Sequence, residues 1–352
     1  MVDPLIPDFL NQTGEGVGQK LQNYFKVASN EKPSRNMVAL NIPALSAPDI
    51  KNMWIEHQRL NSNFSKFYED VSWTDLKHQE FSFTDLKIRI LNNVLKNCVL
   101  CENKCGIDRK FETGHCGVKK SLIASEFMHM GEESVLVPSH TIFFSGCNFK
   151  CVYCQNWDIS QNPNLGLDIP PGKLAKIIDL RRKQGSINVN FVGGDPTPNL
   201  AYIFEVMKNS KENIPVVWNS NLYLSESGMN LLGGFVDLYL TDFKYGNDIC
   251  AEKLSGISNY TEIIGRNHQL ANISGDLIIR HLILPNHVDC CSKPALKWIF
   301  DNLGNDVVLN IMSQYKPAYK SSENVDLNVL PTRKEIEEVI LYAEGLGFVN
   351  LI

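Results

Sequence analysis

The sequence lacks the long apolar runs and the one-sided charge that would assign it to a membrane or to nucleic acid. No apolar stretch reaches the roughly 18 residues that a membrane helix needs. The 34 lysines and arginines are balanced by 39 aspartates and glutamates, so no basic excess points to nucleic acid or to an anionic lipid surface. The first 20 residues have no positive segment followed by an apolar core, which predicts no secretory signal and a cytoplasmic protein.

Cysteine is absent from residues 1–97 and then concentrated, because seven of the ten cysteines lie between residues 98 and 154. In a chain of 352 residues without an export signal, such clustering indicates metal binding rather than disulfides. The remaining cysteines, Cys250, Cys290 and Cys291, show no ligand spacing, and we expect them to be ordinary thiols.

The residue composition and the hydrophobic pattern change along the chain and predict three segments. Residues 1–97 are expected to form a helical extension, 98–139 a metal-binding segment with four cysteines, and 140–352 a barrel domain. Helices are predicted over 47–71, with Ile55 among the inward-facing residues, and over 84–97, with Thr84 as N-cap.

From residue 140 onward, short apolar runs rich in branched and aromatic residues alternate with helical segments. This alternation predicts an α/β fold with a parallel sheet covered by helices, and six strands would form a partial (β/α)6 barrel. In such barrels, functional residues gather at the carboxyl ends of the strands. The six predicted strands are 140–147, 187–194, 215–221, 236–244, 276–284 and 306–315, and the helices between them include 171–185, 199–209, 292–304 and 332–347.

The stretch CNFKCVYC places Cys147, Cys151 and Cys154 within eight residues, directly after the first predicted strand. Thiolates are soft ligands that suit iron–sulfur clusters, zinc or copper(I). A structural zinc site is closed by four protein ligands, whereas three cysteines on a [4Fe–4S] cluster leave one iron open. An open iron can bind a substrate or a cofactor, and this open position explains why a fourth cysteine is missing.

With Tyr153 as its aromatic residue, CNFKCVYC resembles the CxxxCxΦC motif of the radical S-adenosylmethionine (radical SAM) superfamily. The resemblance implies a [4Fe–4S] cluster whose open iron binds SAM, reductive cleavage of SAM, and abstraction of a hydrogen atom from substrate by the resulting radical. The alternative to a radical SAM enzyme is a non-catalytic iron–sulfur or zinc protein that serves electron transfer. Such a protein would bind metal but not SAM.

Longer stretches, among them TIFFSGCNFKCVYCQNWDISQ and VDLYLTDFKY, are similar to the pyruvate formate-lyase activating enzyme-like branch, in the subgroup with an upstream cysteine set. The similarity runs from about residue 98 to residue 319. It implies an oxidoreductase that acts on a protein, either a glycyl-radical enzyme or another peptide, with an electron donor such as flavodoxin or ferredoxin. A radical SAM enzyme that modifies a small molecule is the alternative within the superfamily.

The resemblance also implies the residues that contact SAM, which lie at predicted strand ends except for Tyr153 in the cysteine motif. The GGD motif corresponds to a GGE motif that is common in the superfamily, so this chain has aspartate where glutamate is usual. His281, next to the implied arginine, is expected to be a structural histidine, because neighbouring side chains on a strand point to opposite faces. The implied SAM-binding residues are Tyr153, Gly193, Gly194, Asp195, Asn219, Ser220, Asp242, Lys244 and Arg280.

The upstream cysteines number four, which is enough to close a metal site. Their spacing allows either zinc or a second [4Fe–4S] cluster, and His115 is a competing ligand. Which metal is bound stays open from the sequence. The four residues are Cys98, Cys101, Cys105 and Cys116.

Overall fold

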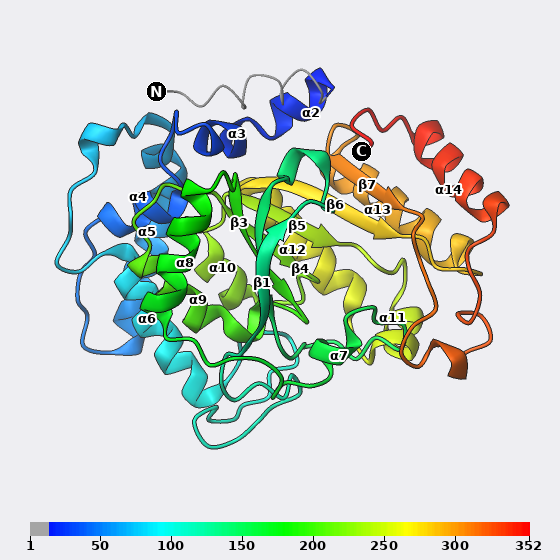
Figure 1. Ribbon diagram of the computed structural model, residues 1–352, viewed down its shortest axis with the longest axis horizontal. Coiled ribbons are helices and arrows are strands. Elements are labelled where there is room, and N and C mark those ends of the chain that lie inside the picture. Colours follow the sequence, from blue (N-terminus) through cyan, green and yellow to red (C-terminus); the bar gives the residue numbers. More distant parts are fainter. Residues whose placement is uncertain (1–13) are drawn as a thin grey trace.

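Seven strands form one sheet in the order in which they occur along the chain (Figure 1). Strand β1 (Ile123–His129) runs antiparallel to β2, and all later neighbours are parallel. The parallel strands coincide with the six apolar runs, which confirms the partial (β/α)6 barrel. They are β2 (Ser139–Phe144), β3 (Asn188–Gly193), β4 (Val216–Ser220), β5 (Leu238–Asp242), β6 (Asp276–Leu282) and β7 (Val308–Met312).

This computed structural model describes residues 14–352; most of the segment examined for a secretory signal lies outside the described residues. Helices follow the parallel strands and cover the outside of the sheet (Figure 1). No helix within the described range is both long and apolar enough to cross a membrane. The helices after β2 are α7 (Trp157–Ser160), α8 (Pro171–Lys183), α9 (Leu200–Asn209), α10 (Glu226–Leu232), α11 (Asp248–Ser255), α12 (Tyr260–Ser274), α13 (Lys293–Leu303) and α14 (Arg333–Leu346).

The N-terminal region is helical, although two details of its prediction are wrong. The N-cap of α6 is Ser82 rather than Thr84, because Asp85 accepts a hydrogen bond from the Ser82 backbone and completes a capping box. Ile55 is 56% exposed, since the inward face of α5 includes Glu56, whose carboxylate accepts a bond from the Leu45 backbone. The helices of this region are α2 (Glu15–Lys20), α3 (Gln22–Ala28), α4 (Arg35–Asn41), α5 (Ile50–Asp70) and α6 (Phe83–Val94).

Helices α2 and α3 close the end of the barrel at which the strands begin. Leu21 and Tyr24 pack in one apolar cluster with inward-facing strand residues such as Leu238 and Ile278. The Tyr24 backbone also donates a 2.8 Å hydrogen bond to Asp276 at the start of β6. Because this end is filled, a ligand does not reach the barrel interior through it.

Candidate functional site

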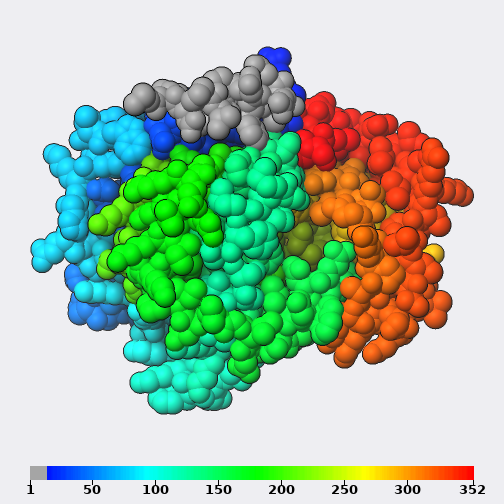
Figure 2. Space-filling view, viewed as in Figure 1, coloured from blue at the N-terminus to red at the C-terminus, as the bar shows by residue number. Residues whose placement is uncertain are grey.

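A cavity of about 400 Å³ opens at the carboxyl ends of the strands. Figure 2 shows a recess on the face drawn there, between the teal and green part and the orange C-terminal part. Every residue that the sequence predicted for the barrel cluster and for SAM lines this cavity. These residues are Cys147, Cys151, Tyr153, Cys154, Gly193, Gly194, Asp195, Asn219, Ser220, Asp242, Lys244 and Arg280.

The three clustered cysteines lie on the loop between β2 and α7, with hydrogen-bond donors around their sulfur atoms. The Phe149 backbone N–H donates to Cys147 Sγ over 3.3 Å. Cys154 Sγ lies 3.3 Å from the hydroxyl of Ser160. Such donors stabilise thiolate sulfur and are typical of iron–sulfur sites, whose potentials they tune.

The sulfur atoms of these three cysteines do not form a compact set of ligands for a single ion. Among residues 14–352, the three cysteines are not part of any group of three ligand atoms within 4.8 Å of one another. A lone tetrahedral zinc ion requires a closer set, with its sulfur ligands about 2.3 Å from the metal. In a [4Fe–4S] cluster the thiolates bind different irons and therefore stand farther apart. Burial raises the pKa of Cys147, and raises that of Cys151 to about 11, so the charge of bound metal would be needed to hold them as thiolates.

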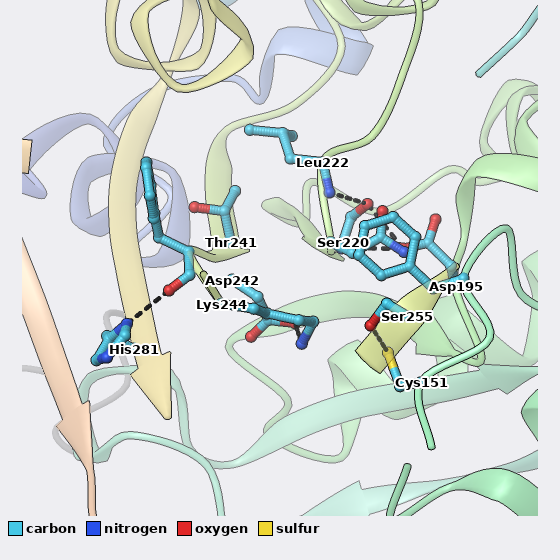
Figure 3. A network of polar contacts seen from close by, with 12 residues as sticks. Cys151, Asp195, Ser220, Leu222, Thr241, Asp242, Lys244, Ser255 and His281 are labelled. Atoms are coloured by element: carbon cyan, nitrogen blue, oxygen red, sulfur yellow. Dashed lines mark hydrogen bonds and ion pairs between the residues drawn. The ribbon is translucent and has the colours of Figure 1, made fainter. Parts of the chain in front are cut away.

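Cys151 also ends a chain of hydroxyl groups that begins at Tyr153. The two phenol oxygens of Tyr153 and Tyr245 are 2.8 Å apart, and Tyr245 lies 2.5 Å from the hydroxyl of Ser255. Ser255, in the last turn of α11, donates to Cys151 Sγ over 2.9 Å (Figure 3). Tyr153 therefore supports the loop that carries the three cysteines through this chain of hydroxyl groups. No sequence pattern pointed to Tyr245 or Ser255.

The two glycines at the end of β3 are required by close packing within the chain itself. A Cβ on Gly193, whose φ is +120°, would lie 2.2 Å from the Phe144 backbone nitrogen. A Cβ on Gly194 would lie 2.1 Å from the carbonyl oxygen of Gly146, directly before the first cluster cysteine. The glycines thus let the end of β3 lie against the cysteine loop, in addition to any close approach to a ligand.

Asp195 joins the ends of β3 and β4. Its buried carboxylate accepts bonds from the Thr197 backbone (2.9 Å), the Ser220 hydroxyl (3.0 Å) and the Asn221 backbone (2.9 Å), and Figure 3 shows it beside Ser220. Asn221 in turn donates to Cys147 Sγ over 3.8 Å. Both carboxylate oxygens of Asp195 are engaged within the chain, which indicates a positioning role for this residue.

Asp242 and Lys244 form an ion pair of 2.7 Å at the end of β5 (Figure 3). Burial alone would lower the pKa of Lys244, but the carboxylate of Asp242 and the neighbouring Cys151 raise it overall, so the lysine stays charged. His281 lies on the other side of β6, bonded to the Phe243 carbonyl (2.7 Å), and is buried and structural as expected.

Arg280 lines the cavity and is paired with two carboxylates that the sequence analysis did not identify. Its guanidinium donates to Glu133 at 2.7 and 2.5 Å and also contacts Glu132. Asn310 on β7 adds a 2.7 Å bond to Glu133. Glu132 itself lines the cavity, so the Arg280 guanidinium lies at the cavity already paired with a carboxylate. These partners are nearly 150 residues from Arg280 in the sequence, so the pairing could not be predicted from a local pattern.

The four upstream cysteines surround one small cavity of about 20 Å³ beside the cluster loop. A Cβ on Gly114 would lie 2.7 Å from Cys105 Sγ, so the loop needs glycine there. Asn103 contacts Cys101 Sγ (3.7 Å) and donates to the Asn148 carbonyl (3.0 Å), next to Cys147. Within the described part of the chain, these four cysteines also contain no group of three ligand atoms inside 4.8 Å.

Comparisons with known proteins agree with this site. The profile of the radical SAM superfamily matches residues 141–294. The uncharacterized protein MJ0674 of Methanocaldococcus jannaschii is 45% identical over 333 residues, covering 92% of this chain and 97% of the relative. The chain belongs to the radical SAM superfamily, which implies an enzyme with a [4Fe–4S] cluster and SAM.

Two further comparisons are more distant. The 7-carboxy-7-deazaguanine synthase of Methanothermobacter thermautotrophicus is 26% identical over 158 residues, covering 43% of this chain and 62% of the synthase. The crystal structure of Streptococcus suis SuiB bound to S-adenosylmethionine aligns with a TM-score of 0.44 and 14% identity, over 58% of this chain and 47% of SuiB. Neither degree of similarity assigns a substrate to this chain.

Proposed function

We propose that the chain binds a [4Fe–4S] cluster at Cys147, Cys151 and Cys154 and uses it to cleave SAM and abstract a hydrogen atom from a polypeptide substrate. The observation that carries this proposal is the convergence of the three cysteines and the predicted SAM-binding residues on one cavity. A non-catalytic electron carrier would have no use for such a pocket. The chemistry supplied by the bound group is one-electron cleavage of SAM into methionine and a 5′-deoxyadenosyl radical.

The residues of the chain position and shield the cofactors. The Asp242–Lys244 pair places one carboxylate and one ammonium group at the cavity, and these charges match the ammonium and carboxylate of SAM. Asn219 adds an amide to the lining. Helices α2 and α3 close the far end of the barrel, which keeps bulk water from reaching the site from below.

The size of the cavity bears on the class of substrate. About 400 Å³ is near the lower end of the roughly 300–1,000 Å³ typical of small-molecule sites. The cofactors take up much of that space, so the substrate meets them at the open rim. An exposed polypeptide segment, such as the glycine loop of a glycyl-radical enzyme or another peptide, suits a rim site better than a second buried small molecule.

The upstream cysteines hold a second [4Fe–4S] cluster rather than zinc. No three of their sulfur atoms lie within 4.8 Å of one another, whereas a single zinc ion draws its ligands closer together, and this supports the assignment. The contacts of Asn103 with Cys101 and Asn148 support a position of this cluster beside the catalytic one, from which it would relay electrons from a donor such as flavodoxin or ferredoxin. Replacing Cys101 with serine is expected to lower iron to about half while the barrel cluster remains. Unchanged iron together with stoichiometric zinc would contradict the assignment.

The catalytic proposal is tested with anaerobically reconstituted full-length protein, dithionite and SAM. We expect 5′-deoxyadenosine and methionine from the unaltered protein and from Cys291→Ser, a cysteine variant outside the cavity. Cys151→Ala is expected to stay folded and to give neither product. Calorimetric titration with SAM separates the alternatives, since a pure electron carrier has no SAM affinity. Absence of both products from the unaltered protein would refute the proposal.

The polypeptide substrate is tested separately, with a glycyl-radical protein encoded beside this gene where one exists. We expect an organic radical signal on that protein by electron paramagnetic resonance after incubation with the reduced enzyme and SAM. SAM cleavage without any such signal would keep the catalytic proposal and remove glycyl-radical activation.

A further inference from the structure

Three potential metal ligands outside the barrel cavity come together on two neighbouring loops. Cys250 lies in the first turn of α11, after β5, whereas His287 and Cys290 lie between β6 and α13. Their ligand atoms all lie within 4.8 Å of one another. In the described residues, no other group of cysteine, histidine or acidic side chains meets this condition, and the cysteines of both cluster segments do not.

The distance between the sulfur atoms is that of two ligands on one ion. Cys250 Sγ and Cys290 Sγ are 3.9 Å apart. A tetrahedral zinc ion with Zn–S bonds of about 2.3 Å places two sulfur ligands about 3.8 Å apart. A disulfide would require about 2.05 Å, so the two sulfur atoms are not bonded to each other. The arrangement is already that of a single-ion site.

One ring nitrogen of His287 meets the 4.8 Å condition, so the residue can act as the nitrogen ligand. Its Nδ1 lies 2.8 Å from the Pro285 carbonyl oxygen and therefore carries the proton. The lone pair is left on Nε2, and a fixed backbone bond of this kind is what usually orients a metal-binding imidazole. His287 is buried while Cys290 is exposed, so the site combines a rigid ligand with a path for an ion to enter.

Asn247 connects the two loops and supports both sulfur ligands. Its side-chain oxygen caps α11 by accepting a 2.8 Å bond from the Cys250 backbone. Its amide nitrogen donates to Cys250 Sγ (3.3 Å) and to the Cys290 carbonyl oxygen (2.6 Å). A donor to the sulfur of a ligand stabilises the thiolate form, and outer contacts of this type hold ligands in place.

We propose that Cys250, His287 and Cys290 bind a Zn²⁺-class divalent cation, with water as the fourth ligand. Two thiolates and one imidazole are a ligand set that suits Zn²⁺, and the exposure of Cys290 leaves room for the water. The site is independent of the catalytic proposal, because it shares no residue with the barrel cavity.

The place of this site in the fold gives it a structural consequence. The cation would tie the first turn of α11 to the loop after β6. The last turn of the same helix carries Ser255, which donates to the cluster ligand Cys151. The helix has eight residues, about 12 Å, so the cation anchors one end of the element that supports the cluster loop at its other end.

The test uses full-length protein whose iron–sulfur clusters have been reconstituted anaerobically, so that the cluster cysteines are occupied. Co²⁺ is titrated into it and read by thiolate-to-cobalt charge-transfer absorption, and Zn²⁺ competition gives the affinity. We expect one equivalent to bind to the unaltered protein and to the control Cys291→Ser. The double variant Cys250→Ser, Cys290→Ser is expected to bind more than about 100-fold more weakly, beyond what the loss of an outer contact costs. Equal affinity in the double variant would overturn the site.

A second measurement needs no variant and so does not depend on how the substituted chains fold. The reconstituted protein is treated with a thiol-alkylating reagent with and without Zn²⁺, and the rate at each cysteine is followed by mass spectrometry. We expect Zn²⁺ to slow alkylation of Cys250 and Cys290 by at least tenfold. Alkylation at the same rate in both samples would overturn the proposal.

Discussion

Arg280 stands between two buried carboxylates, and removing its charge should destabilise the fold in a pH-dependent way. The side chains of Arg280, Glu132 and Glu133 are 12%, 9% and 5% exposed. Arg280→Gln keeps a polar side chain of reduced length and leaves both carboxylates without their cation. Breaking a buried ion pair from one side costs about 3–5 kcal/mol, because the remaining charge is uncompensated.

The expected shift in melting temperature follows from the size of the protein. At about 2.1 cal/mol/K per residue, a chain of 352 residues has an unfolding entropy of about 0.7 kcal/mol/K. A loss of about 3–5 kcal/mol then lowers the melting temperature by roughly 4–7 °C. Thermal unfolding followed by circular dichroism at pH 7.5 measures this shift.

The sign of the pH dependence comes from Glu133. Burial alone would raise its pKa, but Arg280 lowers it overall in the unaltered protein. A carboxyl group with a lowered folded-state pKa contributes stability above its unfolded pKa and loses it as pH falls through the folded value. Without Arg280 the burial effect remains and the pKa is raised, so the variant loses stability as pH rises. The gap between the two proteins should therefore be widest at neutral pH and narrow toward pH 5.

The matched control is the double variant Arg280→Gln, Glu133→Gln, which removes one of the uncompensated charges. We expect it to regain part of the lost melting temperature relative to Arg280→Gln. Two results would refute the reasoning: a melting temperature of Arg280→Gln within 1 °C of the unaltered protein, or a gap that is the same at pH 5 and pH 7.5.

Three further predictions concern the cavity and its surroundings. Gly194→Ala places a methyl group 2.1 Å from the Gly146 carbonyl oxygen, so we expect the free energy of unfolding to fall by about 1–3 kcal/mol. We also expect less cluster iron after reconstitution, and full iron content would count against this prediction. Asp195→Asn changes the carboxylate that accepts the hydrogen bond of the Ser220 hydroxyl, and denaturant unfolding should show a free energy of unfolding lower by about 1–3 kcal/mol. An unchanged free energy of unfolding would mean that the carboxylate is dispensable. Burial lowers the pKa of His281 to about 4, below its unfolded value near 6.5, so its contribution to stability is present above pH 6.5 and falls between pH 6.5 and 4. His281→Gln should show a shallower decline over that range, and an unchanged slope would contradict the assignment.

The barrel could be predicted from the sequence because its physical signal is local. A parallel strand covered on both faces is an apolar run, and all six parallel strands of the structure carry one. Strand β1 was missed because it lies at the edge of the sheet and its apolar residues are interrupted by the polar pair Ser125 and Glu126. The cavity residues could be located for the same reason as the strands, since they sit at strand ends, and strand ends share one edge of the sheet.

The partners of those residues could not be predicted, because they depend on contacts between distant segments. Glu133 meets Arg280 across 147 positions, and Ser255 meets Cys151 across 104. The same holds for Cys250 and His287, whose separation hides a ligand set that only folding assembles. Local sequence patterns predicted which residues line the cavity. The ion pairs of these residues, and the hydrogen bonds that support the cysteine loop, could be seen only in the folded structure.

The central claim is that one iron of a cluster held by Cys147, Cys151 and Cys154 is open to SAM. Electron–nuclear double resonance on the reduced, reconstituted protein with SAM labelled with ¹³C or ¹⁷O at its carboxylate tests this directly. We predict a hyperfine coupling between the cluster and the labelled carboxylate that is lost in Cys151→Ala. A cluster spectrum with no coupling to labelled SAM at saturating concentration would contradict the account.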